Sequence, residues 1–213
     1  MNEVIVLFDG YSKYLDADRM DANCTCTLVK GSKNVIIDTM TAWDRERLID
    51  ALSKNGLKPS DIDYVVCTHS HADHIGNNNL FTNAEHIVGY SVQRGSVFYD
   101  KRIKHEDYEI CDGVRVTATP GHTYEDVTVL VENGNRTDTV KYAITGDLFE
   151  KEEDIADPSL WKSLGTPELE KIQASTRLRI LKFADFIVPG HGPMFKTNSS
   201  LVNSLDEQIL NSR

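Results

Sequence analysis

Short apolar runs separated by polar turns recur along the chain, and this pattern predicts β-strands. Gly31 separates two of the runs, and Asn133 with Gly134 favours a hairpin between two others. The predicted strands cover residues 3–10, 24–31, 33–39, 61–67, 85–90, 113–119, 127–133, 139–145 and 185–190.

Two stretches have a helical pattern instead. Residues 42–56 place apolar side chains on one side and end at a glycine. A threonine N-cap and a proline at the first helical position open a second helix over residues 166–183. The polar tail, 198–213, is expected to form a terminal helix or to fray. Because strands are followed by a helix twice in succession, the order predicts an α+β protein with two facing sheets and helices outside.

Composition narrows the class of protein. The 213 residues, 40% of them hydrophobic, suit one substantial core, so residues 1–213 are expected to form a single domain. No apolar stretch of the sequence approaches the roughly 20 residues that a membrane helix needs. The start of the chain lacks the basic region and cleavage site of a secretory signal. We therefore expect a cytoplasmic protein, with nuclear entry left open and no membrane partner.

Charge and cysteine content add two limits. The net charge of −10 disfavours unselective binding to nucleic acid, so a polyanionic substrate would need a local basic patch or a bound metal. Four cysteines are too few for a disulfide scaffold. Cys24 and Cys26 share a strand face with Leu28 and are expected in the core, with a C-x-C metal pair as the alternative. Cys67, at the end of a buried strand, is expected to be inert.

Histidines concentrate at the ends of predicted strands. The stretch "HSHADH", residues 69–74, holds three of the seven histidines and follows the apolar run "YVV". His122, Asp147 and His191 each follow a further run, after "VTATPG", "YAITG" and "FIVPG". If these strands lie side by side, the loops converge at one edge of the sheets. A lone histidine there is a surface residue, but together these imidazoles and carboxylates predict a metal site with a position open for water.

The H-x-H-x-D-H motif, with the later histidines and aspartate in this order, resembles the metallo-β-lactamase superfamily over essentially the whole chain. The resemblance implies a four-layer αβ/βα sandwich and two Zn²⁺ ions per chain, with iron or manganese as alternatives. It implies that one ion is held by three histidines, the second by an aspartate and two histidines, and that one aspartate bridges them. These sets are His69, His71 and His122; Asp73, His74 and His191; and Asp147.

Residues around these ligands are assigned by the same resemblance. Asp38 matches the aspartate of the family's "DTG" turn and is expected to accept a ring N–H from a ligand histidine. Met40 stands where the family usually has glycine, which leaves the close packing of this turn open. A water molecule, Tyr124 or Glu125 is expected to protonate the leaving group, although both side chains also suit an ordinary loop.

Details within the family favour one branch. A bridging aspartate with no cysteine in the second ligand set disfavours a true β-lactamase. The segments "LFDGY", "THSHADHIGN", "TGDLFE" and "ADFIVPGHGPMF" resemble a branch for which the implied activity is endoribonucleolytic processing of the 3′ end of histone pre-mRNA by a homodimer. In that activity a metal-bridging hydroxide attacks a phosphodiester, and Asp73 and Asp147 are the catalytic residues.

Basic and aromatic residues between the first cluster and His122 have two interpretations. They form either a solvated loop or a substrate lip that stacks on unpaired bases and contacts phosphates. These residues are Arg94, Phe98, Tyr99, Lys101, Arg102 and Lys104. Three other functions stay open: a glyoxalase II-like thioester hydrolase, a mononuclear iron persulfide dioxygenase, and a non-catalytic interaction module stabilised by metal.

Overall fold

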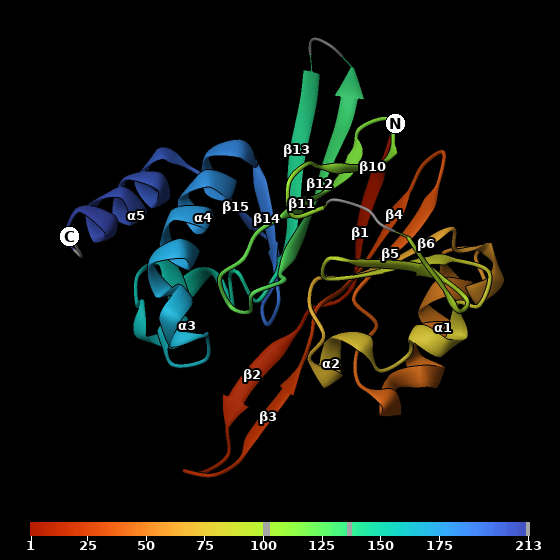
Figure 1. Ribbon diagram of the computed structural model, residues 1–213, viewed down its shortest axis with the longest axis horizontal. Coiled ribbons are helices and arrows are strands. Elements are labelled where there is room, and N and C mark those ends of the chain that lie inside the picture. Colours follow the sequence, from red (N-terminus) through yellow and green to blue (C-terminus); the bar gives the residue numbers. More distant parts are fainter. Residues whose placement is uncertain (100–102, 136–137, 212–213) are drawn as a thin grey trace.

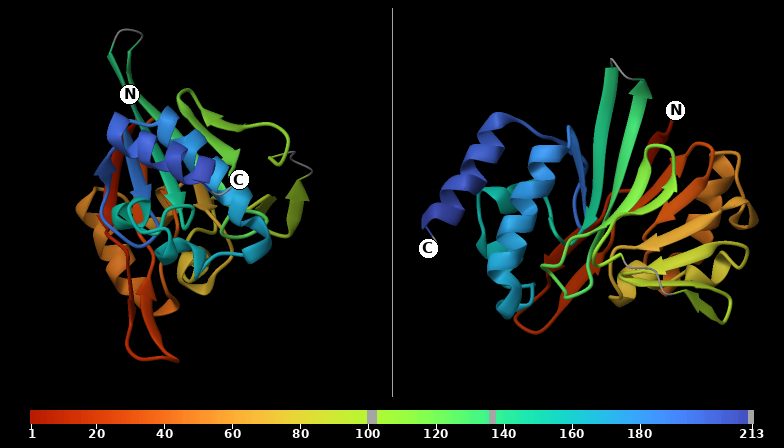
Figure 2. Two further views of the ribbon diagram at one scale, coloured as in Figure 1. Left: turned by 90° about the vertical axis from the view of Figure 1, so that its left-hand side faces the viewer. Right: turned by 45° about the horizontal axis from the view of Figure 1, so that its top comes forward.

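Two β-sheets face each other across the middle of the protein (Figure 1). The computed structural model describes residues 1–99, 103–135 and 138–211. The first sheet has the order β1 (Glu3–Phe8), β4 (Cys26–Lys30), β5 (Asn34–Ile37), β6 (Tyr64–Cys67), β7 (Glu85–Val88), β8 (Ser91–Arg94) and β9 (Val97–Tyr99). The second has the order β10 (Tyr108–Cys111), β11 (Val114–Ala118), β12 (Val127–Asn135), β13 (Asp138–Gly146), β14 (Phe186–Pro189) and β15 (Phe195–Lys196). The strands β2 (Tyr11–Tyr14) and β3 (Met20–Asn23) form a separate hairpin that projects from the sandwich (Figure 2).

Helices cover the outer faces of both sheets (Figure 1). The helix α1 (Arg45–Lys54) covers the first sheet, while α4 (Glu170–Phe183) and α5 (Ser199–Asn211) cover the second. The short helices are α2 (Ala72–Ile75) and α3 (Ser159–Lys162), and single 3-10 turns occupy Ala42–Asp44, Pro59–Asp61, Asn78–Leu80, Glu152–Ile155 and Pro167–Leu169. The four-layer αβ/βα sandwich expected from the sequence is confirmed.

The alternation of side chains along a strand produces these layers. In β5, Val35 and Ile37 point into the core between the two sheets, where they join Val129 and Val188 of the second sheet. Ile36, between them, points outward and packs with Leu48 and Leu52 of α1. A third core joins Ala143 and Ile187 to Ile180 and Leu181 of α4. Buried apolar area therefore holds both helical layers to the sheets.

Strand direction places the candidate ligands at one edge. The strand β6 is parallel to β5 and β7, and β13 is parallel to β14, so the carboxyl ends of each group lie together. The histidine cluster follows β6, while Asp147 and His191 follow β13 and β14. A hydrogen bond from the Val127 amide to the Thr68 carbonyl, 2.9 Å long, joins the two sheets at this edge. The loops from both sheets therefore meet there.

Some predicted features differ in the structure. Asn133 and Gly134 lie inside β12, paired with Val140 and Thr139, so β12 and β13 form the expected hairpin but the Asn-Gly pair is not its turn. The tail forms a helix, α5, and the hydroxyl of Thr166 donates to the His122 carbonyl instead of capping α4. Among the described residues, no helix has both the length and the apolar character needed to cross a membrane.

Candidate metal centre

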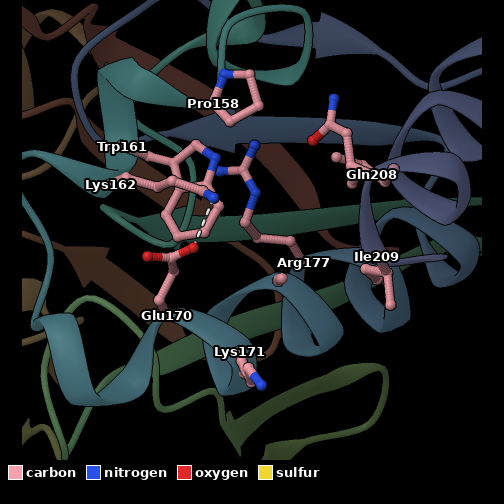
Figure 3. A pocket seen from close by; sticks show the side chains of 10 residues that line it. Pro158, Trp161, Lys162, Glu170, Lys171, Arg177, Gln208 and Ile209 are labelled. Carbon is pink, nitrogen blue, oxygen red and sulfur yellow. Dashed lines mark ion pairs between the residues drawn. The ribbon is translucent and has the colours of Figure 1, made fainter. Parts of the chain in front are cut away.

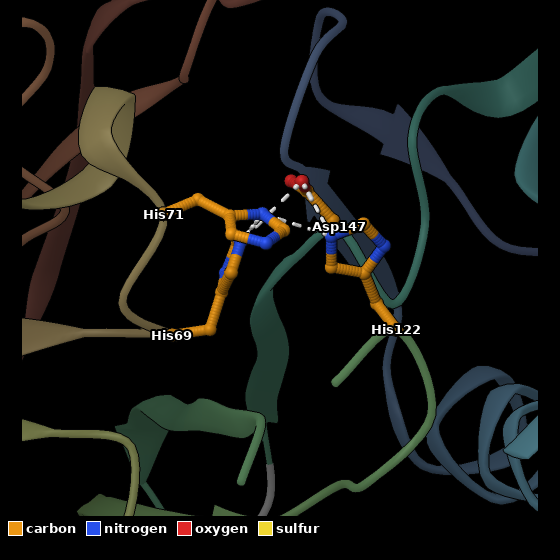
Figure 4. Close-up of side chains that lie close together, drawn as sticks. All are labelled: His69, His71, His122 and Asp147. Atoms are coloured by element: carbon orange, nitrogen blue, oxygen red, sulfur yellow. Dashed lines mark hydrogen bonds and ion pairs between the residues drawn. The ribbon is translucent and has the colours of Figure 1, made fainter. Parts of the chain in front are cut away.

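Three histidines and one aspartate form the first group of side chains at this edge (Figure 4). The Nδ1 atom of His71 lies 2.8 Å from His69 Nε2 and 3.1 Å from His122 Nε2. The Oδ2 atom of Asp147 lies 3.4 Å from His122 Nε2 and 3.6 Å from His69 Nε2. His71 is exposed whereas the other three side chains are buried, so this group opens to the surface on the His71 side.

A second group shares Asp147. The Oδ1 atom of Asp147 lies 3.3 Å from His74 Nε2, and its Oδ2 atom lies 3.3 Å from His191 Nε2. Asp73 Oδ2 lies 3.8 Å from both of these ring nitrogens. The structure thus brings all seven candidate ligands together and places the Asp147 carboxylate between the two groups.

The donor set fits a pair of metal ions. His69 Nε2 and His122 Nε2 both lie within hydrogen-bond distance of His71 Nδ1. Because a ring nitrogen carries either one proton or one lone pair, His71 Nδ1 cannot make a full hydrogen bond to both. His74 Nε2 and Asp147 Oδ1 are buried and make no hydrogen bond with the described residues. These two atoms face each other at 3.3 Å without a hydrogen bond, and a cation bound by both would satisfy them. Imidazole nitrogen and carboxylate oxygen are the donors that zinc accepts, and iron and manganese accept them also.

Burial and neighbouring charges shift the pKa values of the metal-free ligands in different directions. Burial lowers the pKa of His69 and of His122. For His191, burial has the same effect, but the neighbouring Asp147 carboxylate outweighs it and raises the pKa to about 9. Burial alone would raise the pKa of Asp147, yet the surrounding imidazoles, His74 first among them, hold it well below its usual range. Asp147 is therefore an ionised ligand at neutral pH.

Backbone and side-chain partners orient the rings. Asp38 Oδ2 lies 3.0 Å from His74 Nδ1, and Asp38 Oδ1 accepts a hydrogen bond from the Thr68 amide at 2.8 Å. His191 Nδ1 lies 3.1 Å from the carbonyl oxygens of Tyr11 and Asn23. These acceptors favour a proton on Nδ1, so Nε2 is the nitrogen that faces the centre and gives up its proton when a metal ion binds. Asp38 therefore lies where the sequence predicted a tautomer-fixing carboxylate.

The turn that carries Asp38 keeps its close packing without glycine. Met40 has a φ of +59°, the left-handed region that glycine occupies most easily. Its side chain is buried in the core beneath α1, and its carbonyl accepts a 2.9 Å hydrogen bond from the Gly76 amide. Packing of the methionine side chain offsets the backbone strain.

Glu150 is a site residue that the sequence reasoning did not single out. It is 2% exposed, it groups with Asp147 and His191, and its Oε1 atom lies 4.0 Å from His122 Nδ1. Burial, followed by the Asp147 charge, raises its pKa well above its usual range. The signal in the sequence was the segment "TGDLFE", in which Glu150 follows the aspartate by three positions.

The predicted substrate lip is only partly brought together. The strand β8 is antiparallel to β7, so Arg94 lies at the end of β8 away from the cluster, where it donates to the Asn83 carbonyl. Phe98 is exposed, and Tyr99 pairs with Val92 nearer the other end of β8. Lys104 is exposed, whereas residues 101–102, the lysine and arginine of the prediction, lie outside the described residues. Tyr124 and Glu125, the candidate proton donors, are exposed on the loop after His122.

Comparisons with known proteins agree with this geometry. The family model "Metallo-beta-lactamase superfamily" matches residues 19–109. Metallo-beta-lactamase domain-containing protein 1 of Xenopus laevis is 39% identical over 198 residues, which are 92% of this chain and 82% of that protein. This chain belongs to the metallo-beta-lactamase superfamily. The resemblance that the sequence motifs indicated is thereby confirmed for the family and for this relative.

Two further comparisons concern hydrolases of the superfamily. The N-acyl homoserine lactonase of Bacillus thuringiensis is 29% identical, over 63% of this chain and 58% of that protein. The structure of a subclass B3 metallo-beta-lactamase of Bradyrhizobium japonicum superposes with a TM-score of 0.61 at 16% identity, covering 98% of this chain and 94% of that one. The chain is accordingly a metallo-hydrolase of this superfamily.

Proposed function

We propose that this protein is a two-zinc hydrolase that cleaves a phosphodiester bond of RNA near a 3′ end. The observation that carries the hydrolase mechanism is the position of the Asp147 carboxylate, with oxygens 3.3 Å from both His74 Nε2 and His191 Nε2 and 3.4 Å from His122 Nε2. One carboxylate in contact with both histidine groups suits a bridging ligand.

In this proposal the seven side chains divide as the two groups do. His69, His71 and His122 would hold one ion, and Asp73, His74 and His191 the other, with Asp147 between them. When bound, the two ions supply a hydroxide nucleophile at neutral pH and neutralise charge on phosphoryl oxygens.

The chain's own residues prepare this centre. Asp38 holds the His74 ring, and the carbonyls of Tyr11 and Asn23 hold the His191 ring, with Nε2 pointing inward. These two rings would therefore need little reorientation when a metal ion binds. Asp73 is 22% exposed and therefore stands between the buried group and the solvent, where a substrate would enter. We propose Asp73 and Asp147 as the catalytic residues because they alone contribute carboxylates to the two ligand sets.

Support for RNA as the substrate comes from sequence motifs and from surface chemistry. The motifs resemble the branch for which an endoribonuclease is implied. Tyr124 is 61% exposed directly after a ligand loop, and Phe98 and Lys104 are exposed on the segment that follows β8, so exposed rings and a cation could contact bases and phosphates. The net charge of −10 makes this local arrangement and the metal ions necessary for a polyanion to bind.

A second candidate is hydrolysis of a small ester or lactone. The similarity to an N-acyl homoserine lactonase favours it, as does the displacement of Arg94 from the metal centre. A small neutral substrate would need neither the lip nor a basic surface.

Cleavage assays separate these candidates. Zinc-loaded protein is incubated with end-labelled RNA carrying a histone pre-mRNA 3′ end, with DNA of the same sequence, with an acyl homoserine lactone and with lactoylglutathione. We expect RNA cleavage that Asp147→Ala reduces by at least about 100-fold, whereas Asp50→Ala, a change at an exposed carboxylate of α1, leaves it intact. Turnover of the lactone or thioester without RNA cleavage would overturn the RNA proposal and leave the hydrolase.

Salt dependence tests the lip separately. Changing Lys101, Arg102 and Lys104 to alanine should weaken RNA binding and reduce the slope of log affinity against log salt by roughly 0.7 for each phosphate that is no longer neutralised. Zinc content and hydrolysis of a small phosphodiester should stay unchanged. An unchanged slope would show that RNA, if bound, binds elsewhere.

A further inference from the structure

A cavity of about 250 Å³ lies between α3, α4 and α5, apart from the metal centre (Figure 3). Its walls are largely apolar, with contributions from Pro158, Ala174, Leu205 and Ile209. None of the seven candidate metal ligands lines it. Its volume is below the roughly 300–1,000 Å³ of sites for drug-sized ligands, so it suits a small molecule.

Two buried N–H groups beside this cavity lack acceptors. Trp161 is 3% exposed, and its Nε1 atom makes no hydrogen bond with the described residues. Arg177 is fully buried, and its Nε atom is likewise without a partner among them. A buried donor without an acceptor costs about 1–3 kcal/mol, and both of these belong to residues that line one cavity. A ligand with an acceptor group bound in this cavity would supply the kind of partner that these N–H groups lack.

The remaining bonds of Arg177 hold its guanidinium in place. Its two terminal nitrogens pair with Asp154, and one of them also donates to the Leu148 carbonyl at 2.8 Å. Its guanidinium carbon lies 4.2 Å from the ring centre of Phe149 and 5.1 Å from that of Trp161. The cation is therefore fixed before any ligand arrives, and Nε is its one nitrogen without a hydrogen bond to the described residues.

Charge around the cavity favours an anion. Lys162 and Lys171 join Arg177 in the lining, whereas Glu170 is the single acidic residue of the lining. Glu170 is already paired with the Lys162 ammonium at 2.5 Å, and the Lys162 ammonium also lies 5.6 Å from the Trp161 ring centre. Lys171 is left as an exposed cation at the mouth. Because Asp154 pairs with Arg177 and Glu170 with Lys162, the positive charge that remains at the cavity is that of Lys171, which favours an anion at the mouth.

We propose that this cavity is a second binding site, for a small molecule that joins an apolar body to a carboxylate. The apolar body packs against Ala174, Leu205 and Ile209, and the carboxylate oxygens accept from Trp161 Nε1–H and Arg177 Nε–H. The site does not depend on the proposed function, because no residue of the metal centre contributes to it.

The protein offers a direct reporter for this site. Its two tryptophans are Trp161 and the 91% exposed Trp43, so Trp43→Phe leaves Trp161 as the single indole. Zinc-loaded Trp43→Phe protein is titrated with hexanoate, hexanamide and hexanol, while the fluorescence and the ¹⁵N-detected indole N–H of Trp161 are followed. We expect saturable shifts with hexanoate and at least about fivefold weaker binding of the two uncharged analogues.

Variants place the binding in the cavity. Ala174→Leu fills the cavity and should abolish the shifts, whereas Ser175→Leu, on the exposed side of the same helix, should not. Lys171→Glu, at an exposed position, should weaken hexanoate binding and leave hexanol unchanged. Saturable binding that survives Ala174→Leu would assign the carboxylate to the metal centre and overturn the proposal. Equal affinities for hexanoate and hexanamide would refute the preference for a carboxylate. The absence of any shift in the Trp161 signals would refute the proposal that the cavity is a binding site.

Discussion

Gly190 lies directly against the carboxylate of Asp147. A Cβ atom at position 190 would fall 2.0 Å from Asp147 Oδ1, well inside van der Waals contact. The backbone of Gly190 also donates to the Phe149 carbonyl at 2.9 Å, which holds the two loops together. Only glycine at this position leaves room for the Asp147 carboxylate, which lies between the two ligand groups.

Gly190→Ala should displace Asp147 and damage the metal centre. We expect fewer than two zinc ions per chain and a loss of hydrolytic activity of about 100-fold, because a shift of about 1 Å in a catalytic group has this effect. Zinc content by mass spectrometry and a kinetic assay measure both. Gly95→Ala is the control, since its added Cβ meets nothing within 4 Å although its φ is +59°. Equal zinc content in the two variants would show that the Gly190 contact does not position Asp147.

Asp38→Asn should weaken the ion held by His74. The asparagine keeps the shape of the side chain but lacks the charge that favours a proton on His74 Nδ1. We expect about 10–100-fold weaker binding of one zinc ion, with the other ion unaffected, in a chelator competition titration. Asp50→Asn on α1 should leave both affinities unchanged. If Asp38→Asn weakened both ions equally or neither, the assignment of Asp38 to one group would fail.

The sequence predicted the site residues that directly follow a strand, and it failed where the direction of a strand was not known. His122, Asp147 and His191 were located because each follows an apolar run. The strands before them run in the same direction, since β13 is parallel to β14 and one antiparallel strand, β12, separates β11 from β13. Arg94 was misplaced, because the antiparallel hairpin of β7 and β8 turns the chain back and carries Arg94 to the far end. Nothing in the sequence distinguishes Gly190 from an ordinary loop glycine, since its role is a contact across 43 positions.

The hairpin of β2 and β3 was also missed, for a different reason. Its strands, "YSKY" and "MDAN", are four residues long, contain no apolar run, and bury only Asn23. The cavity beside α4 is lined by residues of three separate helices, so its lining could not be read from the pattern of any one of them.

Asp126 should make the metal-free protein less stable as the pH rises. Burial raises the pKa of its carboxyl to about 7, above the value of about 3.9 in an unfolded chain. The folded state therefore binds this proton more tightly, and the stabilisation is complete below about pH 4 and is lost as the pH rises through about 7. The shift corresponds to roughly 4 kcal/mol at most. In Asp126→Asn this loss should be absent.

Denaturant unfolding of metal-free wild type and Asp126→Asn at pH 5 and pH 8 measures this difference. The free energy of unfolding of the wild type, measured relative to that of the variant, should be lower at pH 8 than at pH 5. A constant difference would contradict the raised pKa.

The buried cysteines should be unreactive in the folded protein. Cys24, Cys26 and Cys67 are fully buried free thiols, as expected from the sequence, and burial raises the pKa of each. Because the thiolate is the reactive form, a thiol reagent at pH 8 should modify at most one thiol per chain, that of the partly buried Cys111. Unfolding in guanidinium should release all four. Modification of two or more thiols in the native protein would contradict this.

The zinc content of Asp147→Ala tests the central claim most directly. In elemental analysis after zinc loading, the wild-type protein should hold two ions per chain, and Asp147→Ala at most one, with hydrolytic activity lower by at least about 100-fold. Its thermal unfolding in the metal-free state should show that it remains folded. Two zinc ions per chain and full activity in Asp147→Ala would contradict the assignment of Asp147 as the ligand that joins the two groups.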